Sequence, residues 1–116
     1  MTEFVEVPEF SSDLKKIKKF RSIYEDLQRF TTALEVVLPD CLRGTVPISR
    51  LGEDVKVPVY KVKHFRCTSL TGKGSMRRFR IIYVYDEGKD RVTLIEIYFK
   101  NGKQNHDKER ILKYFS

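Results

Sequence analysis

Three cationic side chains on neighbouring predicted strands are the residues best placed for chemistry in this sequence. Lys61 and Lys63 lie two positions apart, so on a regular strand they share a face. Arg80 interrupts a run of aromatic and aliphatic residues in which a purely structural sheet would favour Thr or Val. Cations on adjoining strands repel one another unless an anion lies between them. The pattern therefore predicts an anion site, in which the planar Arg80 guanidinium would bind two phosphate oxygens at once.

His106 is the first candidate for proton transfer, because histidine titrates nearest to neutral pH. The alternative is a histidine on a surface loop without a chemical role, and the sequence leaves both open. A lysine crowded by Arg80 is a second candidate, because neighbouring positive charge lowers the pKa of a lysine. His64 faces away from Lys61 and Lys63 by strict alternation, so a catalytic role for it would require a β-bulge.

The positive charge of the chain is concentrated in its second half. Residues 1–50 balance 8 Lys and Arg against 8 Asp and Glu, whereas residues 51–116 hold 15 against 8, which accounts for the whole net charge of +7. A basic half predicts a polyanionic partner, with nucleic acid ahead of a membrane surface. The alternative is a basic surface that serves solubility alone. Further candidates for contacts with a nucleic acid backbone are Arg66, Lys73, Arg77, Arg78, Lys100 and Lys103.

These candidates would be positioned by an antiparallel sheet. Three segments are rich in β-branched and aromatic residues and predict strands over Val59–Cys67, Arg78–Tyr85 and Arg91–Phe99. The connections between them are short and contain glycine, which is typical of antiparallel neighbours. Glu3–Val7 predicts a further short strand, closed by Pro8, whose edge is open to a partner.

Two amphipathic helices are predicted ahead of the three strands. Apolar residues recur at helical spacing from Phe10 to Phe20, and Ser22 and Glu25 have the spacing of a capping box that starts a second helix. The inward stripe of the second helix would be Tyr24, Leu27, Phe30, Leu34 and Val37. Such an αα-hairpin covers one face of a sheet.

The remaining segments complete a single α+β domain over residues 1–116. Asp40–Pro58 holds two prolines and two glycines without periodicity and predicts a loop, and Asp107–Phe115 predicts a short helix. The expected order is strand, helix, helix, three antiparallel strands and a short helix.

Membrane, metal and cofactor classes find no support in the sequence. No apolar run approaches the ~18 residues of a membrane span, and the acidic N-terminus lacks the order of a signal peptide. Cys41 and Cys67 suggest no disulfide framework, which favours the cytoplasm. The cysteines and histidines match no common zinc spacing, so neither a metal nor a cofactor is expected. The glycines around Lys73 lack the first glycine of a phosphate-binding loop.

The strands resemble those of the RelE/ParE superfamily of bacterial and archaeal toxins, especially its RelE-like endoribonucleases. The segments that carry the resemblance are Tyr60-Lys61-Val62-Lys63, Phe79-Arg80-Ile81-Ile82-Tyr83 and Ile97-Tyr98-Phe99-Lys100, in this order after an αα-hairpin. The resemblance implies a microbial-RNase-like fold of order β-α-α-β-β-β-(α). It also implies the toxin of a toxin–antitoxin pair, with a cognate antitoxin as protein partner and with mRNA and the ribosome as RNA partners.

The resemblance further implies metal-independent cleavage of mRNA by attack of a 2′-OH on the adjacent phosphate. In this chemistry Arg80 would stabilise the pentacovalent phosphate, and Lys61 and Lys63 would add positive potential. His106 would fill the acid–base role that a His or Tyr near the C-terminus has in many relatives.

Two departures from the family pattern bear on activity. Thr68–Arg77 is longer than the connection in the compact ribonucleases and forms a basic arm, and Asn101 stands where relatives often have arginine. Lys103 or Arg66 would have to substitute for that arginine. Two alternatives therefore stay open, a ParE-like toxin that inhibits DNA gyrase without cleaving RNA, and a basic RNA- or DNA-binding module that shares the fold. The oligomeric state and the cleavage specificity are not predicted.

Overall fold

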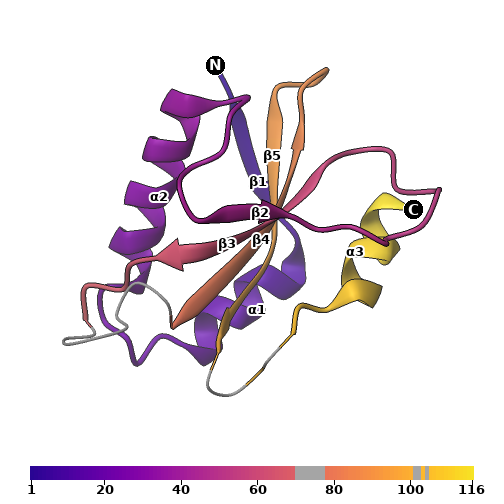
Figure 1. Cartoon of the computed structure of the whole chain (residues 1–116). Coiled ribbons are helices and arrows are strands. Elements are labelled where there is room, and N and C mark those ends of the chain that lie inside the picture. Colours follow the sequence, from indigo (N-terminus) through magenta and orange to yellow (C-terminus); the bar gives the residue numbers. More distant parts are fainter. Residues whose placement is uncertain (70–77, 101–102, 104) are drawn as a thin grey trace.

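A five-stranded mixed sheet forms the centre of the fold (Figure 1). The computed structural model describes residues 1–69, 78–100, 103 and 105–116. The strand order is β1-β5-β4-β3-β2; β1 is parallel to β5, and every other pair is antiparallel. The predicted α+β class is confirmed, and so is the predicted order of the elements apart from the additional strand β2. The elements are β1 Glu3–Glu6, α1 Pro8–Lys16, α2 Ile23–Val37, β2 Thr45–Pro47, β3 Val59–Phe65, β4 Phe79–Asp86, β5 Arg91–Phe99 and α3 Lys108–Phe115.

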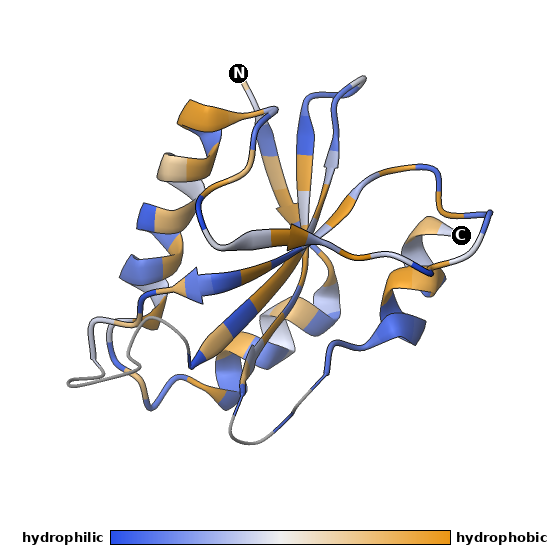
Figure 2. Cartoon of the chain, in the orientation of Figure 1, coloured by the Kyte–Doolittle hydropathy of each residue, from blue (hydrophilic) through white to orange (hydrophobic). Residues whose placement is uncertain are grey.

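The sheet separates two hydrophobic cores. The larger core lies between the sheet and the helices α1 and α2, and it includes Phe10, Leu34 and Ile81. The smaller core lies on the opposite face, where Ile82 contacts the segment 48–58 and α3. The central strand β4 is buried from Phe79 to Tyr85, because both of its faces are covered. The central strands are largely hydrophobic, whereas the turn between β4 and β5 is hydrophilic (Figure 2).

A β-bulge in β5 changes which face its side chains meet. Ile82 pairs with Glu96 and Tyr83 with Leu94, so Ile95 is an extra residue in β5. As a result, Leu94 belongs to the larger core and Ile95 to the smaller one. Glu96 therefore lies on the same face as its cross-strand partner Ile82, the face on the side of α3. Strict alternation would instead place Glu96 on the opposite face, beside Leu94.

The structure differs from the sequence prediction in the segment before β3. Asp40–Pro58 was predicted as a loop, but Thr45–Pro47 forms the edge strand β2, which pairs with β3. Three residues that end in proline carry no periodicity that could reveal a strand. The segment that follows β2 is largely exposed, but Ile48 and Leu51 pack into the smaller core.

The predicted start of α2 was wrong in phase. Tyr24 was expected to face inward, but its side chain is 54% exposed, and Ile23 is fully buried in its place. Ser22 occupies the N-cap position without a side-chain bond to the helix backbone. Its hydroxyl instead donates to Asp26 at 2.6 Å. The buried Asp26 therefore takes the hydroxyl that a capping box would have used.

Two of the predicted basic residues, Lys73 and Arg77, lie outside the described residues, as does most of the predicted basic arm Thr68–Arg77. Within the described part of the chain, no helix has the length and apolar character needed to cross a lipid bilayer.

A buried ion pair joins α1 and α3 at the half of β5 that β1 does not cover. β1 pairs with β5 only as far as Leu94. Beyond that point, Asp13 of α1 accepts the Ile97 N–H at 3.2 Å, and Arg110 of α3 donates to the Ile95 carbonyl at 2.9 Å. Asp13 and Arg110 also bind each other at 2.7 Å. The two side chains thus satisfy backbone groups that a longer β1 would have bound.

Replacing Asp13 with alanine is expected to lower the free energy of unfolding by about 3 kcal/mol, because it leaves the Arg110 guanidinium and the Ile97 N–H without an acceptor. Urea denaturation of the two proteins measures the difference. The matched control is Glu25→Ala, since Glu25 is 77% exposed and lies 3.8 Å from Arg29. Its effect should stay within about 0.5 kcal/mol. Equal effects of the two substitutions would contradict the role given to Asp13.

Candidate functional site

The structure brings Lys61 and Arg80 to one face of the sheet, on the side of α3. Lys61 pairs with Ile82, which pairs in turn with Glu96, so these three residues form one cross-strand row. Arg80 pairs with Tyr98 in the next row. Residues that are directly opposite on neighbouring strands point to the same face. Lys61, Arg80, Glu96 and Tyr98 therefore lie together at one end of the sheet.

Arg80 is held at this face by the backbone of β3. Arg80 is buried, with 9% of its surface exposed. Its Nη1 donates to the carbonyl of Lys63 at 3.2 Å and to the carbonyl of Phe79 at 3.2 Å. The Lys63 carbonyl is accessible because β3 has a bulge between Val62 and Phe65. The bulge thus brings the guanidinium to the backbone of Lys63.

Lys61 is half-buried among other cations. Its burial lowers the pKa of its ammonium, the charges of Lys63 and Arg80 lower it further, and the carboxylate of Glu96 opposes part of the change. A lysine in such surroundings releases a proton more readily than an exposed one. Lys61 therefore has the electrostatic surroundings of a group that exchanges protons.

Glu96 is the member of this site that the sequence prediction missed. It is 2% exposed, and its carboxylate binds the Lys103 ammonium and accepts the Asp107 N–H at 2.7 Å. Lys103 Nζ lies 5.5 Å from the centroid of the Tyr98 ring. A glutamate in the middle of an apolar strand was the available signal. Its face could not be assigned because the bulge at Ile95 breaks the alternation.

His106 is positioned by the hydrogen bond from the N–H of the following residue, Asp107, to the Glu96 carboxylate. Asp107 is the N-cap of α3, and its side chain accepts the Arg110 N–H at 3.1 Å. Burial lowers the pKa of His106, and the nearby charge of Lys61 lowers it further, against the opposing effect of Glu96. The imidazole is therefore neutral at pH 7, which is the state of a proton acceptor.

Two buried polar atoms of the site have no hydrogen-bond partner among the described residues. They are Nδ1 of His106 and the hydroxyl of Tyr98. Burial and the nearby Glu96 raise the pKa of Tyr98 to about 12, so its O–H remains a donor at neutral pH. Buried polar atoms without partners are rare, because each costs free energy. Both atoms are buried, so neither is open to solvent in this structure.

The other predicted contacts are not all part of this cluster. Arg78 and Lys100 are joined at the ends of β4 and β5, where the Lys100 N–H donates to the Arg78 carbonyl at 2.7 Å. Lys103 binds Glu96, as described above. Arg66 lies elsewhere and lines a cavity next to α2. His64 lies in the bulge of β3, where its ring occupies the space that a Cβ on Gly44 would need.

The cysteines lie away from this cluster and are not paired. Cys41 is half-buried and accepts a hydrogen bond from the Tyr83 hydroxyl at 3.7 Å, whereas Cys67 is buried and lies 3.7 Å from the Ser22 hydroxyl. The described residues hold no group of three or more His, Cys, Asp or Glu arranged to bind a metal ion.

Comparisons of the chain with protein family models, with curated proteins and with solved structures found no match.

The pKa of His106 is expected to lie below 6.5 in the folded protein. Substitution Lys103→Met should raise it, because the change removes a cation near the imidazole and leaves the Glu96 carboxylate without its counter-ion. The titration of the imidazole Cε1–H in proton NMR spectra measures this pKa, and a His64→Gln variant assigns the two histidine signals. The control is Lys89→Met in the turn between β4 and β5. An unchanged or lower pKa in Lys103→Met would contradict the proposed geometry.

The same lowered pKa makes the stability depend on pH. Between the pKa of His106 in the folded protein and 6.5, the unfolded chain binds more protons. The contribution of the neutral imidazole to stability is therefore fully present above pH 6.5 and is lost as the pH falls towards the folded pKa.

Two substitutions of Glu96 should separate its hydrogen bonds from its charge. Glu96→Ala is expected to lower the free energy of unfolding by about 2 kcal/mol, because the Asp107 N–H and the Lys103 ammonium lose their acceptor. Glu96→Gln keeps an acceptor for the Asp107 N–H and should cost about half as much. It should also lower the pKa of His106, since Glu96 raises it. Denaturation and NMR titration measure both effects, and equal losses from the two substitutions would count against a hydrogen-bonding role.

Proposed function

We propose that this chain is an endoribonuclease that cleaves single-stranded RNA by attack of a 2′-OH on the adjacent phosphate, and that it acts as a RelE-like toxin. One observation carries the proposal. Cations from β3 and β4 lie at one end of the sheet together with a neutral histidine from the segment before α3. Lys61, Arg80 and His106 come from distant parts of the sequence, and each has the state that one step of this reaction needs.

The first step removes the proton of the 2′-OH. His106 is suited to accept this proton, because its imidazole is neutral at pH 7. The 2′-oxygen then forms a bond to the adjacent phosphorus. The resulting pentacovalent phosphate carries an extra negative charge, which the Arg80 guanidinium stabilises.

The second step breaks the bond between phosphorus and the 5′-oxygen. The leaving oxygen takes a proton from the Lys61 ammonium, whose pKa is lowered by burial and by Lys63 and Arg80. The products are a 2′,3′-cyclic phosphate on one fragment and a 5′-OH on the other. Afterwards His106 gives its proton to water and Lys61 takes a proton from water, so both groups return to their starting states.

The toxin part of the proposal rests on the resemblance of the strand segments to RelE-like endoribonucleases. It includes mRNA on the ribosome as the substrate, a cognate antitoxin as the protein partner and the cytoplasm as the place of action. The excess of positive charge in residues 51–116 supports a polyanionic substrate.

Cleavage of a short single-stranded RNA by the purified protein tests the reaction. His106→Gln and Arg80→Met should each lower the rate by about 100-fold or more, because each removes a group that acts only in the transition state. The acidic limb of the rate–pH profile should lie below pH 6.5, where His106 becomes protonated. A 2′-deoxy residue at the cleaved position should abolish cleavage. Lys89→Gln, in the turn between β4 and β5, is the charge control.

Induction of the wild-type protein in a bacterial host, followed by mapping of mRNA 5′ ends, tests the toxin. New 5′ ends together with growth arrest are expected from the wild type and from Lys89→Gln, and neither from His106→Gln. Growth arrest without new ends would favour a gyrase inhibitor over a nuclease. A folded protein that causes no arrest would favour a nucleic-acid-binding module.

A further inference from the structure

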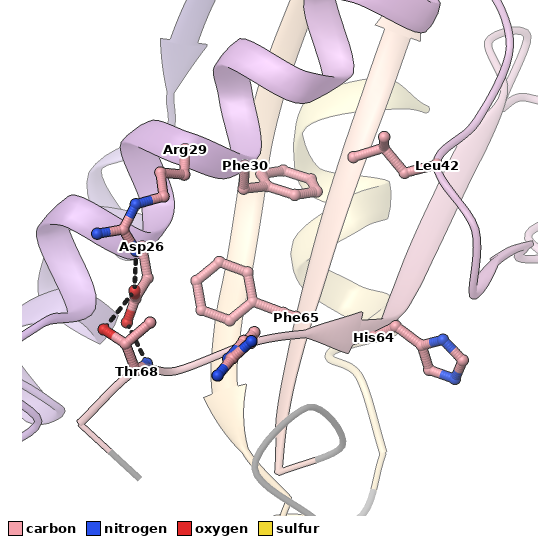
Figure 3. Close-up of a pocket in the computed structure, with 8 residues that line it drawn as sticks. Asp26, Arg29, Phe30, Leu42, His64, Phe65 and Thr68 are labelled. Carbon is pink, nitrogen blue, oxygen red and sulfur yellow. Dashed lines mark hydrogen bonds and ion pairs between the residues drawn. The ribbon is translucent and has the colours of Figure 1, made fainter. Parts of the chain in front are cut away.

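A cavity of about 230 Å³ lies between α2 and the end of β3, apart from the cluster around Glu96 (Figure 3). Its wall is aromatic and aliphatic. The buried rings of Phe30 and Phe65 pack edge to face there, with ring centroids 6.0 Å apart and an interplanar angle of 71°, and Leu42 completes the apolar lining. Two arginines, Arg29 and Arg66, also line the cavity. The proposed reaction uses none of these five residues.

The charge of this cavity is positive. Its only carboxylate among the described residues is Asp26, which accepts the Ser22 hydroxyl at 2.6 Å, the Thr68 N–H at 2.9 Å and the Arg29 guanidinium at 3.0 Å. This carboxylate therefore has its partners within the protein. Arg66 is exposed and has no ion pair with any described residue. A cationic rim next to aromatic side chains matches a nucleotide, whose phosphate is anionic and whose base is flat and aromatic.

The outer edge of β3 is open beside this cavity. β2 covers β3 from Tyr60 to Val62, and the last backbone contact is the Lys63 N–H to the Gly44 carbonyl at 2.8 Å. Past that contact, no described strand pairs with the outer edge of β3. From Lys61 to Arg66 the strand spans about 16 Å at its usual rise per residue. Because the Lys61 side chain lies on the face of α3 and the cavity lies on the face of α2, an RNA strand bound at Lys61 would reach Arg66 by passing round this open edge.

We propose that this cavity binds one nucleotide of the RNA a short distance from the cleaved bond, with the base against the apolar wall and a phosphate at Arg66. The inference rests on the proposed nuclease function and adds a subsite to it. An acidic peptide of a protein partner would also fit the arginines. The open edge of β3 between Lys63 and Arg66, together with the apolar wall and the size of the cavity, favours a nucleotide.

Binding of a fluorescent 2′-O-methyl hexanucleotide, which the enzyme cannot cleave, tests the subsite separately from catalysis. Arg66→Gln should weaken binding on the order of tenfold, as should Leu42→Trp, which fills the cavity. Lys89→Gln, which removes an exposed cation from the turn between β4 and β5, is the control and should bind as the wild type does. Circular dichroism and thermal melting establish that each variant is folded.

A series of hexanucleotides with one abasic position each locates the base. For the wild type, one position should weaken binding when its base is missing. In Leu42→Trp the same abasic position should cause no further loss, because the base has already been excluded. The Arg66→Gln protein should still respond to it, since its apolar wall is intact.

Three results would overturn the subsite. The first is that Arg66→Gln and Leu42→Trp both bind the hexanucleotide as tightly as the wild type does. The second is that the wild type binds all abasic oligonucleotides equally well. The third is that the abasic position weakens binding to Leu42→Trp as much as it weakens binding to the wild type. Displacement of the RNA by a polyglutamate peptide, together with indifference to abasic positions, would assign the cavity to an acidic protein segment. Failure of the nuclease proposal would appear differently, as hexanucleotide binding without cleavage of the matching unmodified RNA.

Discussion

The carboxylate of Glu96 is the interaction on which the candidate site depends. It is buried on a face that also carries Lys61 and Arg80, and it binds Lys103 and the backbone of Asp107. Without an anion, cations on adjoining strands would drive this end of the sheet apart. One carboxylate reduces the repulsion but does not cancel it, so the face stays positive. The same contact fixes the segment that presents His106.

Two interruptions of regular pairing shape the site. The extra residue Ile95 turns Glu96 onto the face of α3, and the irregular pairing after Val62 exposes the Lys63 carbonyl to the Arg80 guanidinium. Without the bulge in β5, Glu96 would lie beside Leu94 on the face of the larger core, and the charged residues would lose their alignment. Bulges are often found next to functional sites because they redirect a side chain without changing the fold.

The sequence was sufficient for the parts of the fold that follow simple periodicity. β3, β4, β5 and α3 begin and end within about two residues of their predicted bounds, because hydrophobic alternation and turn residues are local signals. The short strand β2 and the choice of which face of α2 points inward depend on tertiary contacts that local sequence does not encode. For this reason Tyr24 was wrongly assigned to the inward face. For the site, the cations and His106 were recognisable by type. The role of Glu96 and the separate location of Arg66 depend on irregular pairing and on packing against α2, which no pattern of residue types shows.

The ion pair between Asp13 and Arg110 affects the order in which parts of the fold form during synthesis. Arg110 and His106 are translated after every strand of the sheet, so the strands emerge from the ribosome before the residues that complete the end of β5. Until then, the Ile95 carbonyl and one side of Asp13 lack the guanidinium that they bind in the finished molecule. The end of β5 is therefore completed only after the segment that carries α3 has been synthesised.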